Sequence, residues 1–383
     1  MNSSKRLKYL GVSLFLIILL IVVVSIYHNL TQVSQYSILY ISNFSKIEDI
    51  IALNASTLFI VGSKTCGNIS HGVAGYYYLN DNEFKQVNLS KLFCCGAIYS
   101  VAYNGSALML AGACKISGVL HPAIALISYN KVTNLTSYIP MGYYPGRALA
   151  VAWFNKTWFI GGNFLFNLDQ HYVSVMFLIG LKGNSTSNLT LNISNILNQL
   201  PEGCILSLSV GHNCILIGGK FVIYLVLFKF NSTSIYEINM TKSIFKYPGF
   251  IISLSQFNSS TWVVGGEYFP VNSTICHPYL VLYNSLNSCI NYIKLNYTIG
   301  FVTSVSSYNG NIVVSLRVPF KTPQGVEGGT VILEGKINAL KQTFDEVNIS
   351  INQLLSLNNR IIGGGYKVTG NADEGILIFL NEN

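Results

Sequence analysis

The stretch Trp158-Phe159-Ile160-Gly161-Gly162 decides the fold, because variants of it recur along the whole chain. Each copy is a short apolar run that ends in small residues, and successive copies lie roughly 50 residues apart, a period typical of repeat architectures. The other copies are Leu58-Phe59-Ile60-Val61-Gly62, Leu108-Met109-Leu110-Ala111-Gly112, Ile215-Leu216-Ile217-Gly218-Gly219, Trp262-Val263-Val264-Gly265-Gly266, the degenerate Ile312-Val313-Val314-Ser315-Leu316, and Arg360-Ile361-Ile362-Gly363-Gly364.

An asparagine stands in the turn before every copy. Asparagine tolerates the left-handed backbone conformation that tight hairpin turns demand. Each copy is therefore expected to be the second strand of a hairpin. The seven turn asparagines are Asn54, Asn104, Asn155, Asn213, Asn258, Asn309 and Asn358.

Each repeat has room for four short strands. In the fifth repeat we expect them at Ile251–Phe257, Thr261–Gly265, Pro278–Tyr283 and Cys289–Leu295. Four antiparallel strands per repeat predict a blade of a β-propeller. The alternative, a two-sheet sandwich, has no reason to repeat its sequence seven times. The sequence therefore predicts an all-β, seven-bladed β-propeller.

The two ends of the chain predict how the ring closes. The seventh repeat begins near Ile351 and stops after its third strand, Gly375–Leu380. The segment Tyr36–Ile47 resembles the fourth strands of the other repeats and has no earlier partner. We expect this N-terminal strand to complete the last blade as its outer strand, which removes exposed sheet edges.

The glycine doublets resemble those of kelch repeats. They close the second strand at Gly161-Gly162, Gly218-Gly219, Gly265-Gly266 and Gly363-Gly364, and a hydrophobic third strand follows, as in Tyr279–Asn284. The resemblance covers about 36–383 and departs from the family in that the fourth strands carry no tryptophan. It implies a propeller fold, whose functions range from protein binding to copper-dependent oxidation. The glycines are expected where blades converge and a side chain would meet the next sheet.

The N-terminus predicts a membrane anchor. Lys5, Arg6 and Lys8 precede an uncharged apolar run, residues 9–27, that is long enough to span a bilayer. Positive charge on the leading flank favours a cytoplasmic N-terminus. We expect residues 1–8 in the cytoplasm, 9–27 as the transmembrane helix, 28–35 as a linker and 36–383 as an extracellular propeller. The alternative is a cleaved signal peptide.

Sequons and cysteines also indicate an exterior location at the plasma membrane. Seventeen N-x-[ST] sequons after the anchor predict a coat of N-glycans. They are Asn29, Asn43, Asn54, Asn68, Asn88, Asn104, Asn134, Asn155, Asn184, Asn188, Asn192, Asn231, Asn239, Asn258, Asn272, Asn296 and Asn348.

Eight cysteines, an even number, suit a disulfide framework in such a compartment. We expect Cys66 and Cys114 each to pair with one member of the vicinal pair Cys94-Cys95, in an order that the sequence leaves open. Cys204 is expected to pair with Cys276, and Cys214 with Cys289. The alternative is that the cysteines are free, buried thiols.

The sequence contains weak candidates for a reactive site. His71, His121, His171 and His277 recur at similar distances after their repeats' glycines, so they are expected on one face of the ring. Equivalent positions in neighbouring blades lie too far apart to share a metal ion. A structural role at the beginning of the third strand is the expectation, with no metal and no cofactor.

Acidic residues point even less clearly to catalysis. The doublets Glu48-Asp49, Asp345-Glu346 and Asp373-Glu374 are expected to be solvated loop charges, because adjacent strand residues point to opposite faces. Glu202 and Glu267 are the best lone candidates for an acid or base near the loop face. The chain carries no recognised hydrolase, phosphate-binding or dinucleotide-binding motif.

Composition narrows the function further. Half of the residues are apolar, 10% are charged, and the net charge of +8 has no basic run beyond the N-terminus. Nucleic acid is therefore not an expected partner. Because the chain has few carboxylates, little of its stability should depend on their ionisation. This composition suits an acidic and hot habitat such as that of thermoacidophilic archaea.

The sequence predicts a membrane-anchored, glycosylated, archaeal-type cell-surface propeller. We expect it to bind or scaffold another surface protein or glycan and not to act as an enzyme. The alternative is an extracellular hydrolase or oxidase with its site at the channel mouth. A third possibility is a subunit of a larger envelope assembly.

Overall fold

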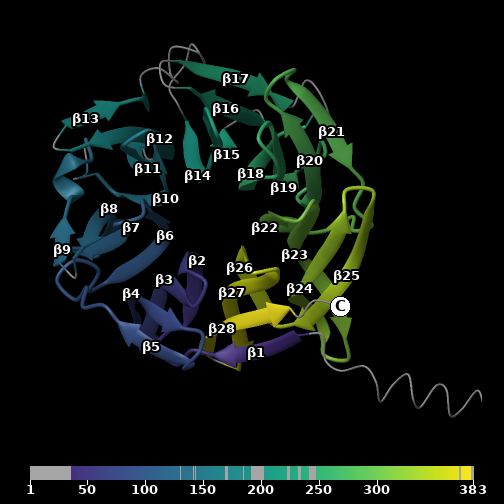
Figure 1. Ribbon diagram of the computed structural model, residues 1–383, viewed down its shortest axis with the longest axis horizontal. Helices are drawn as coiled ribbons and strands as arrows, with labels where there is room; N and C mark the ends of the chain where they lie inside the picture. Colours follow the sequence, from purple (N-terminus) through teal and green to yellow (C-terminus); the bar gives the residue numbers. More distant parts are fainter. Residues whose placement is uncertain are drawn as a thin grey trace, which may run out of the picture.

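The computed structural model describes residues 36–129, 131–140, 142, 144–168, 171–183, 185–190, 202–221, 225–231, 234–240, 247–370 and 372–380 (Figure 1). Within these segments no helix has the length and apolar character needed to cross a bilayer. The predicted cytoplasmic end, anchor and linker, residues 1–35, lie outside the described residues.

The described strands pair antiparallel in seven units of four. Units one to three are β2 (Lys46–Asn54), β3 (Thr57–Cys66), β4 (Ile69–Tyr78), β5 (Glu83–Gln86); β6 (Gly96–Tyr103), β7 (Ala107–Ile116), β8 (Val119–Ser128), β9 (Lys131–Asn134); and β10 (Gly146–Phe154), β11 (Thr157–Leu168), β12 (His171–Lys182), β13 (Ser185–Asn188).

Units four to seven follow the same order of strands. They are β14 (Gly203–Val210), β15 (Ile215–Phe221), β16 (Val226–Phe230), β17 (Ile235–Asn239); β18 (Gly249–Gln256), β19 (Thr261–Tyr268), β20 (His277–Asn284), β21 (Cys289–Ile293); β22 (Phe301–Tyr308), β23 (Asn311–Thr322), β24 (Gly325–Lys336), β25 (Ala339–Val347); and β26 (Ile349–Leu357), β27 (Arg360–Thr369), β28 (Ala372–Leu380), β1 (Tyr36–Tyr40).

The units follow one another around a common centre (Figure 1). Units four and five are joined into one sheet by a single bridge between Lys220 and Phe250. The purple strand β1 lies beside the yellow strand β28, with Tyr36 opposite Leu380. The expected all-β fold is confirmed, and the four strands expected in the fifth repeat coincide with β18 to β21 to within three residues.

The apolar copies of the repeat lie in the second strands and are buried in all seven units apart from Arg360, which explains why the repeat is so apolar. In β3, every residue from Thr57 to Ser63 is buried, because neighbouring sheets cover both faces. In contrast, the outer strand β13 is exposed throughout. The core consists of clusters between successive sheets. The cluster between units seven and one joins Ile47 and Leu58 to Ile362 and Leu377.

The turn asparagines stabilise the hairpin turns in two different ways. Asn155, Asn309 and Asn358 adopt positive φ, as expected from the sequence. Asn54 and Asn258 instead accept a hydrogen bond at Oδ1 from the backbone N–H two residues later, at 2.9 and 3.0 Å. A side chain that imitates a backbone turn satisfies the same requirement without a left-handed residue.

A β-bulge recurs at the same place in the first strand of all seven units. One residue of each first strand has no partner in the second strand, so the strand bends there. The bulged residues are Glu48, Tyr99, Leu149, Leu206, Ile252, Thr303 and Asn352. The bulge gives the seven units one equivalent position near the centre of the ring.

The two positions of a glycine doublet exclude a side chain for different reasons. A Cβ on Gly265 would meet the Val302 side chain of the next unit, as expected from the sequence. A Cβ on Gly266 would instead overlap the carbonyl oxygen of Phe250 beside the bulge of its own sheet. In the seventh unit the equivalent doublet is Gly364-Gly365, one residue later than the sequence pattern suggested.

Candidate binding face

Two faces of the ring follow from the strand directions. We call the upper face the one that carries the turns between second and third strands, together with the beginnings of the first strands. The lower face carries the other two sets of turns. Since Tyr36 pairs with Leu380 and Tyr40 with Ile376, β1 begins at the lower face and ends at the upper one.

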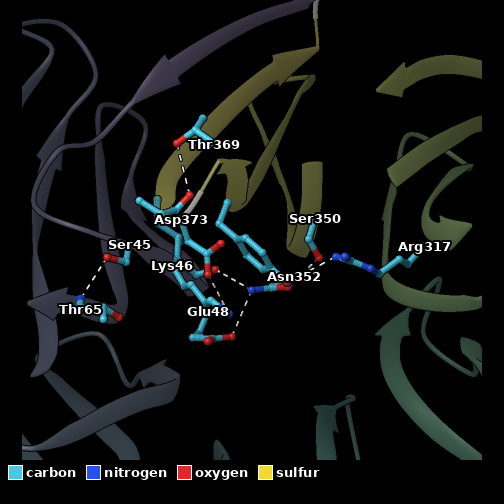
Figure 2. Close-up of polar contacts among 12 residues, drawn as sticks. Ser45, Lys46, Glu48, Thr65, Arg317, Ser350, Asn352, Thr369 and Asp373 are labelled. Carbon is cyan, nitrogen blue, oxygen red and sulfur yellow. Dashed lines mark hydrogen bonds and ion pairs between the residues drawn. The ribbon is translucent and has the colours of Figure 1, made fainter. Parts of the chain in front are cut away.

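A polar cluster lies at the upper end of the ring centre, where units seven and one meet (Figure 2). Asn352 Nδ2 donates to the carbonyl oxygen of Ile47 at 2.9 Å and to Glu48 Oε2 at 3.1 Å. Lys46 Nζ forms an ion pair with Asp373 Oδ2 at 3.1 Å. Burial raises the pKa of the Glu48 carboxyl, and the charge of Lys46 opposes that shift.

Four cations of the upper face lie over aromatic rings. Lys46 Nζ lies 4.5 Å from the centroid of the Tyr366 ring, and the Arg317 guanidinium carbon lies 6.0 Å from the same ring. Lys220 lies over Phe250 at 4.7 Å, and Arg147 over Tyr99 at 5.9 Å, each pair bringing together two elements at the upper end of the ring. Such contacts hold a cation in place without neutralising it. Within the described segments the only ion pair is that of Lys46, and none of the other three cations forms one.

A groove of about 1010 Å³ opens on the upper face across units one to four. Arg147 and Lys115 are the charged side chains in its wall. Its apolar wall comes from Leu120, Leu149 and Leu206. A second cavity, of about 650 Å³, lies at the lower end of the junction of units seven and one.

Exposed apolar side chains gather at the hairpin tips of the upper face. Nine of the fifteen large hydrophobic residues that are exposed in the described chain lie there, although tips of hairpins are normally polar. They are Ile69, Ile116, Val119, Leu165, Tyr172, Val271, Ile275, Val326 and Val368. Exposed apolar surface of this kind is typical of a site that contacts another molecule.

The four histidines lie at the upper ends of the third strands. His71 contacts the carbonyl oxygen of Cys94, and His277 stacks on Tyr268 with ring centroids 5.3 Å apart. His171 is exposed, and His121 Nδ1 is buried without a hydrogen-bond partner in the described segments. No three His, Cys, Asp or Glu side chains in those segments lie close enough to hold a metal ion.

The acidic doublets do not lie in loops, so that part of the expectation was wrong, although Asp345 and Glu374 are exposed to solvent. All three lie in strands: Glu48-Asp49 in β2, Asp345-Glu346 in β25 and Asp373-Glu374 in β28. Asp373 is held by Lys46, and Glu346 accepts a hydrogen bond from the Tyr36 hydroxyl at 2.6 Å.

Asp49 is enclosed in the seam between units one and two. Its Oδ2 accepts from the Val101 N–H at 2.9 Å and from Ser100 Oγ at 3.1 Å, and its Oδ1 accepts from the Ile50 N–H at 2.8 Å. Burial raises the pKa of the carboxyl to about 7, and these donors offset only part of the shift. The same position in units five and six carries Ser253 and Ser304, whose Oγ atoms accept from the next unit's Val305 and Leu354 N–H groups.

The two lone carboxylates singled out from the sequence lie in different units. Glu202 forms an isolated bridge with Val175 of unit three, whereas Glu267 is the last residue but one of β19 in unit five. Glu267 is hydrogen-bonded to Cys276, and burial raises the pKa of both groups, that of Cys276 to about 11. Lys220 lies near Glu267 and near Cys204, so the four residues form one upper-face group.

All eight cysteine thiols are unbridged in the structure. Cys94 forms thiol hydrogen bonds with both Cys95 and Cys114, and burial raises the pKa of Cys95 and Cys114. Cys66 lies at the hairpin tip of β3 opposite Ile69. Cys214 is buried and Cys289 is exposed.

We expect protein from an oxidising compartment to carry a bridge from Cys114 to Cys94 or Cys95, because these thiols already touch. Peptide mapping without reductant measures this directly. A bridge from Cys114 to Cys214 or Cys289 would contradict the arrangement of units, since those cysteines lie in units four and five.

The sequons are compatible with glycosylation. Fourteen sequon asparagines fall in the described residues, and of these ten are exposed, four are half-buried and none is buried. Asn29, Asn184 and Asn192 lie outside the described residues.

No protein-family model matches the sequence, and no curated protein sequence matches it either. Similar solved structures exist. The Pyrococcus horikoshii acylaminoacyl peptidase aligns with a TM-score of 0.50 and 10% identity over 86% of this chain and 52% of that one. The GH74 xyloglucanase from Xanthomonas campestris aligns with a TM-score of 0.54 and 9% identity over 87% of this chain and 53% of that one.

The fold is of the β-propeller type. Both similar structures have this type of fold, and at such low identity the likeness concerns the fold alone. The chain spans about half the length of either of them.

Proposed function

We propose that the chain is a kelch-like, seven-bladed propeller closed by its N-terminal strand. Each four-stranded unit would be one blade, and β1 would complete the last. Two observations support closure: β1 pairs with β28 over five residues, and a Cβ on Gly364 of unit seven would meet the Ile47 side chain of unit one. The glycine doublets support the kelch-like type.

Closure predicts that an apolar residue of β1 matters for the whole fold. Ile38 packs on the cluster between units six and seven, whereas the adjacent Ser37 is exposed. We expect Ile38→Asp to lower the free energy of unfolding by about 3 kcal/mol, because a charge would replace a packed side chain. Denaturant unfolding measures the loss, with Ser37→Asp as the matched control. Equal stability of the two variants would contradict closure by β1.

We further propose that the protein is a membrane-anchored, glycosylated surface module that binds another surface protein or glycan through its upper face. The observation that carries this proposal is the gathering of exposed apolar side chains at the upper hairpin tips, around a groove and three unpaired cations. Exposure of so much apolar surface on one face favours a partner that covers it.

The position of β1 favours the orientation that such binding needs. The linker of residues 28–35 would reach at most about 28 Å when fully extended. Since β1 begins at the lower face, the lower face would lie near the membrane and the upper face would point away from it. A cysteine probe at His277 should therefore be biotinylated on intact cells, and labelling at Asn155 alone would reverse the orientation.

Site-specific photo-crosslinking on intact cells tests the binding face. A photoreactive residue at Val326 of the upper face should give a discrete crosslinked species. The same residue at Leu286 should not, because Leu286 is equally exposed but lies in a lower-face turn. Crosslinks from Leu286 alone, or from neither position, would contradict the proposal.

An extracellular hydrolase is the second candidate, favoured by Glu48. A half-buried carboxyl with a raised pKa, beside an amide and a lysine at the centre of a ring, is a common setting for a general acid. If the protein hydrolyses any member of a panel of chromogenic glycosides or peptide substrates, Glu48→Gln should abolish that activity. Glu374→Gln in β28 is the control. Activity that survives Glu48→Gln would exclude this site.

A further inference from the structure

The upper-face groove combines two cations with an absence of acidic residues. Arg147 and Lys115 stand in its wall, and no Asp or Glu does within the part of the chain that the structure describes. Both side chains are exposed, and neither forms an ion pair with a described carboxylate. A ligand that fills the groove is therefore expected to bring negative charge of its own.

The rim of the same groove is apolar. Ile69, Val119 and Leu165 line it, and all three are among the exposed hydrophobic residues of the upper face. Ile116 lies beside them, opposite Val119 in the β7–β8 hairpin. A ligand that covers these side chains gains free energy only if it offers apolar surface in return.

We propose that the groove binds a segment of a partner protein in which apolar and acidic side chains are interspersed. This inference rests on the proposed surface-binding function and names its partner class. Apolar residues of the segment would cover Ile69, Val119 and Leu165, while its carboxylates would meet Arg147 and Lys115. The groove volume of about 1010 Å³ suits a short extended segment.

An anionic glycan fits the same groove less well. Its carboxylates or sulfates would satisfy the two cations, but its hydroxyl groups would leave the aliphatic rim without an apolar partner. Asn68 is a sequon at the edge of the groove, so a glycan attached there would narrow the entrance. Binding is therefore best measured on both the glycosylated and the deglycosylated protein.

Fluorescence anisotropy with labelled peptides tests the proposal. The probes are an alternating leucine–glutamate octapeptide, its leucine–glutamine and leucine–lysine counterparts, and polygalacturonate as an anionic glycan. We expect the glutamate peptide to bind at least tenfold more tightly than the glutamine peptide, and more weakly at high salt. Arg147→Glu combined with Lys115→Glu should reverse the preference in favour of the lysine peptide. Lys131→Glu, in an exposed lower-face strand, is the matched charge control and should change nothing.

The reversal of preference is a gain that a misfolded variant does not produce, so it separates a binding role from a structural one. No saturable binding of the glutamate peptide up to about 1 mM, or equal binding of the lysine peptide, overturns the inference. Binding of polygalacturonate alone, lost in the double variant, overturns the peptide class but leaves the proposed surface-binding function intact. The photo-crosslinking at Val326 decides that function separately.

Discussion

Unfolding at pH 4 should require roughly 2–4 kcal/mol more free energy than unfolding at pH 7, with Asp49 as a principal cause. The carboxyl of Asp49 has a pKa of about 7 in the folded protein, because it is buried between units one and two. Its ordinary value is 3.8. Between these two values the folded state holds a proton that the unfolded state has released.

The sign follows from this difference. Below about pH 4 the carboxyl is protonated in both states, so its burial no longer lowers the free energy of unfolding. As the pH rises toward 7, the folded state must either keep its proton or bury a charge, so stability is lost. Glu48 and Glu267 also have raised pKa values and act in the same direction. The composition suggested that little stability depends on the ionisation of carboxylates, and Asp49 is an exception because its carboxyl is desolvated in the folded protein.

Asp49→Ser tests the assignment, since serine occupies the same position in units five and six and accepts the equivalent hydrogen bond there. The variant should fold, and its stability should depend much less on pH. Denaturant unfolding at pH 4, 5.5 and 7 is the measurement, and Asp81→Ser in an exposed turn is the control. If the free energy of unfolding of Asp49→Ser varied with pH as much as that of the native protein, this account would be refuted. It would also be refuted if the native protein unfolded between pH 4 and 3.

Among glycine-to-alanine substitutions in the fifth unit, Gly266→Ala should lower the free energy of unfolding most. The new Cβ would overlap the carbonyl oxygen of Phe250, a backbone atom beside the bulge at Ile252. Neither the second strand nor the bulged first strand can move without disturbing the neighbouring sheet. We expect a loss of about 3 kcal/mol in the free energy of unfolding.

Gly363→Ala is the matched control, because its Cβ would lie 3.3 Å from a methyl group of Ile351 and meet no backbone atom. That variant should be close to neutral. Unit six carries Leu316 at the position of Gly266, so its bulge at Thr303 already accommodates a side chain. If Gly266→Ala is as stable as Gly363→Ala, the bulge carbonyl is not the reason for the second glycine.

The strands of the fold could be predicted because their signals are local. The apolar copies mark strands buried on both faces, and the asparagines mark the turns before them. These patterns placed the strands of unit five to within a few residues. The bulges could not be predicted, because a bulge depends on the register between two strands and is not marked by a particular residue type or local sequence pattern.

The candidate site was largely missed from the sequence. Arg147 and Lys220 were not singled out, although Lys220 directly follows a glycine doublet at the end of an apolar copy. That repeated position could have marked the upper end of the ring. The histidines, which were singled out, lie at hairpin tips and form no cluster with other metal-binding side chains in the described residues.

By itself, the sequence determined the repeat, the all-β fold and the expectation that the chain's two ends meet. Each depends on residues close together in the chain or on a count of strands. Only the tertiary structure decided which polar residues face one another. Lys46 and Asp373 come together because the first and last units are neighbours, and the carboxyl of the half-buried Asp49 is desolvated because the second unit packs over it. Charge and burial at such positions depend on contacts between distant segments, which no local pattern encodes.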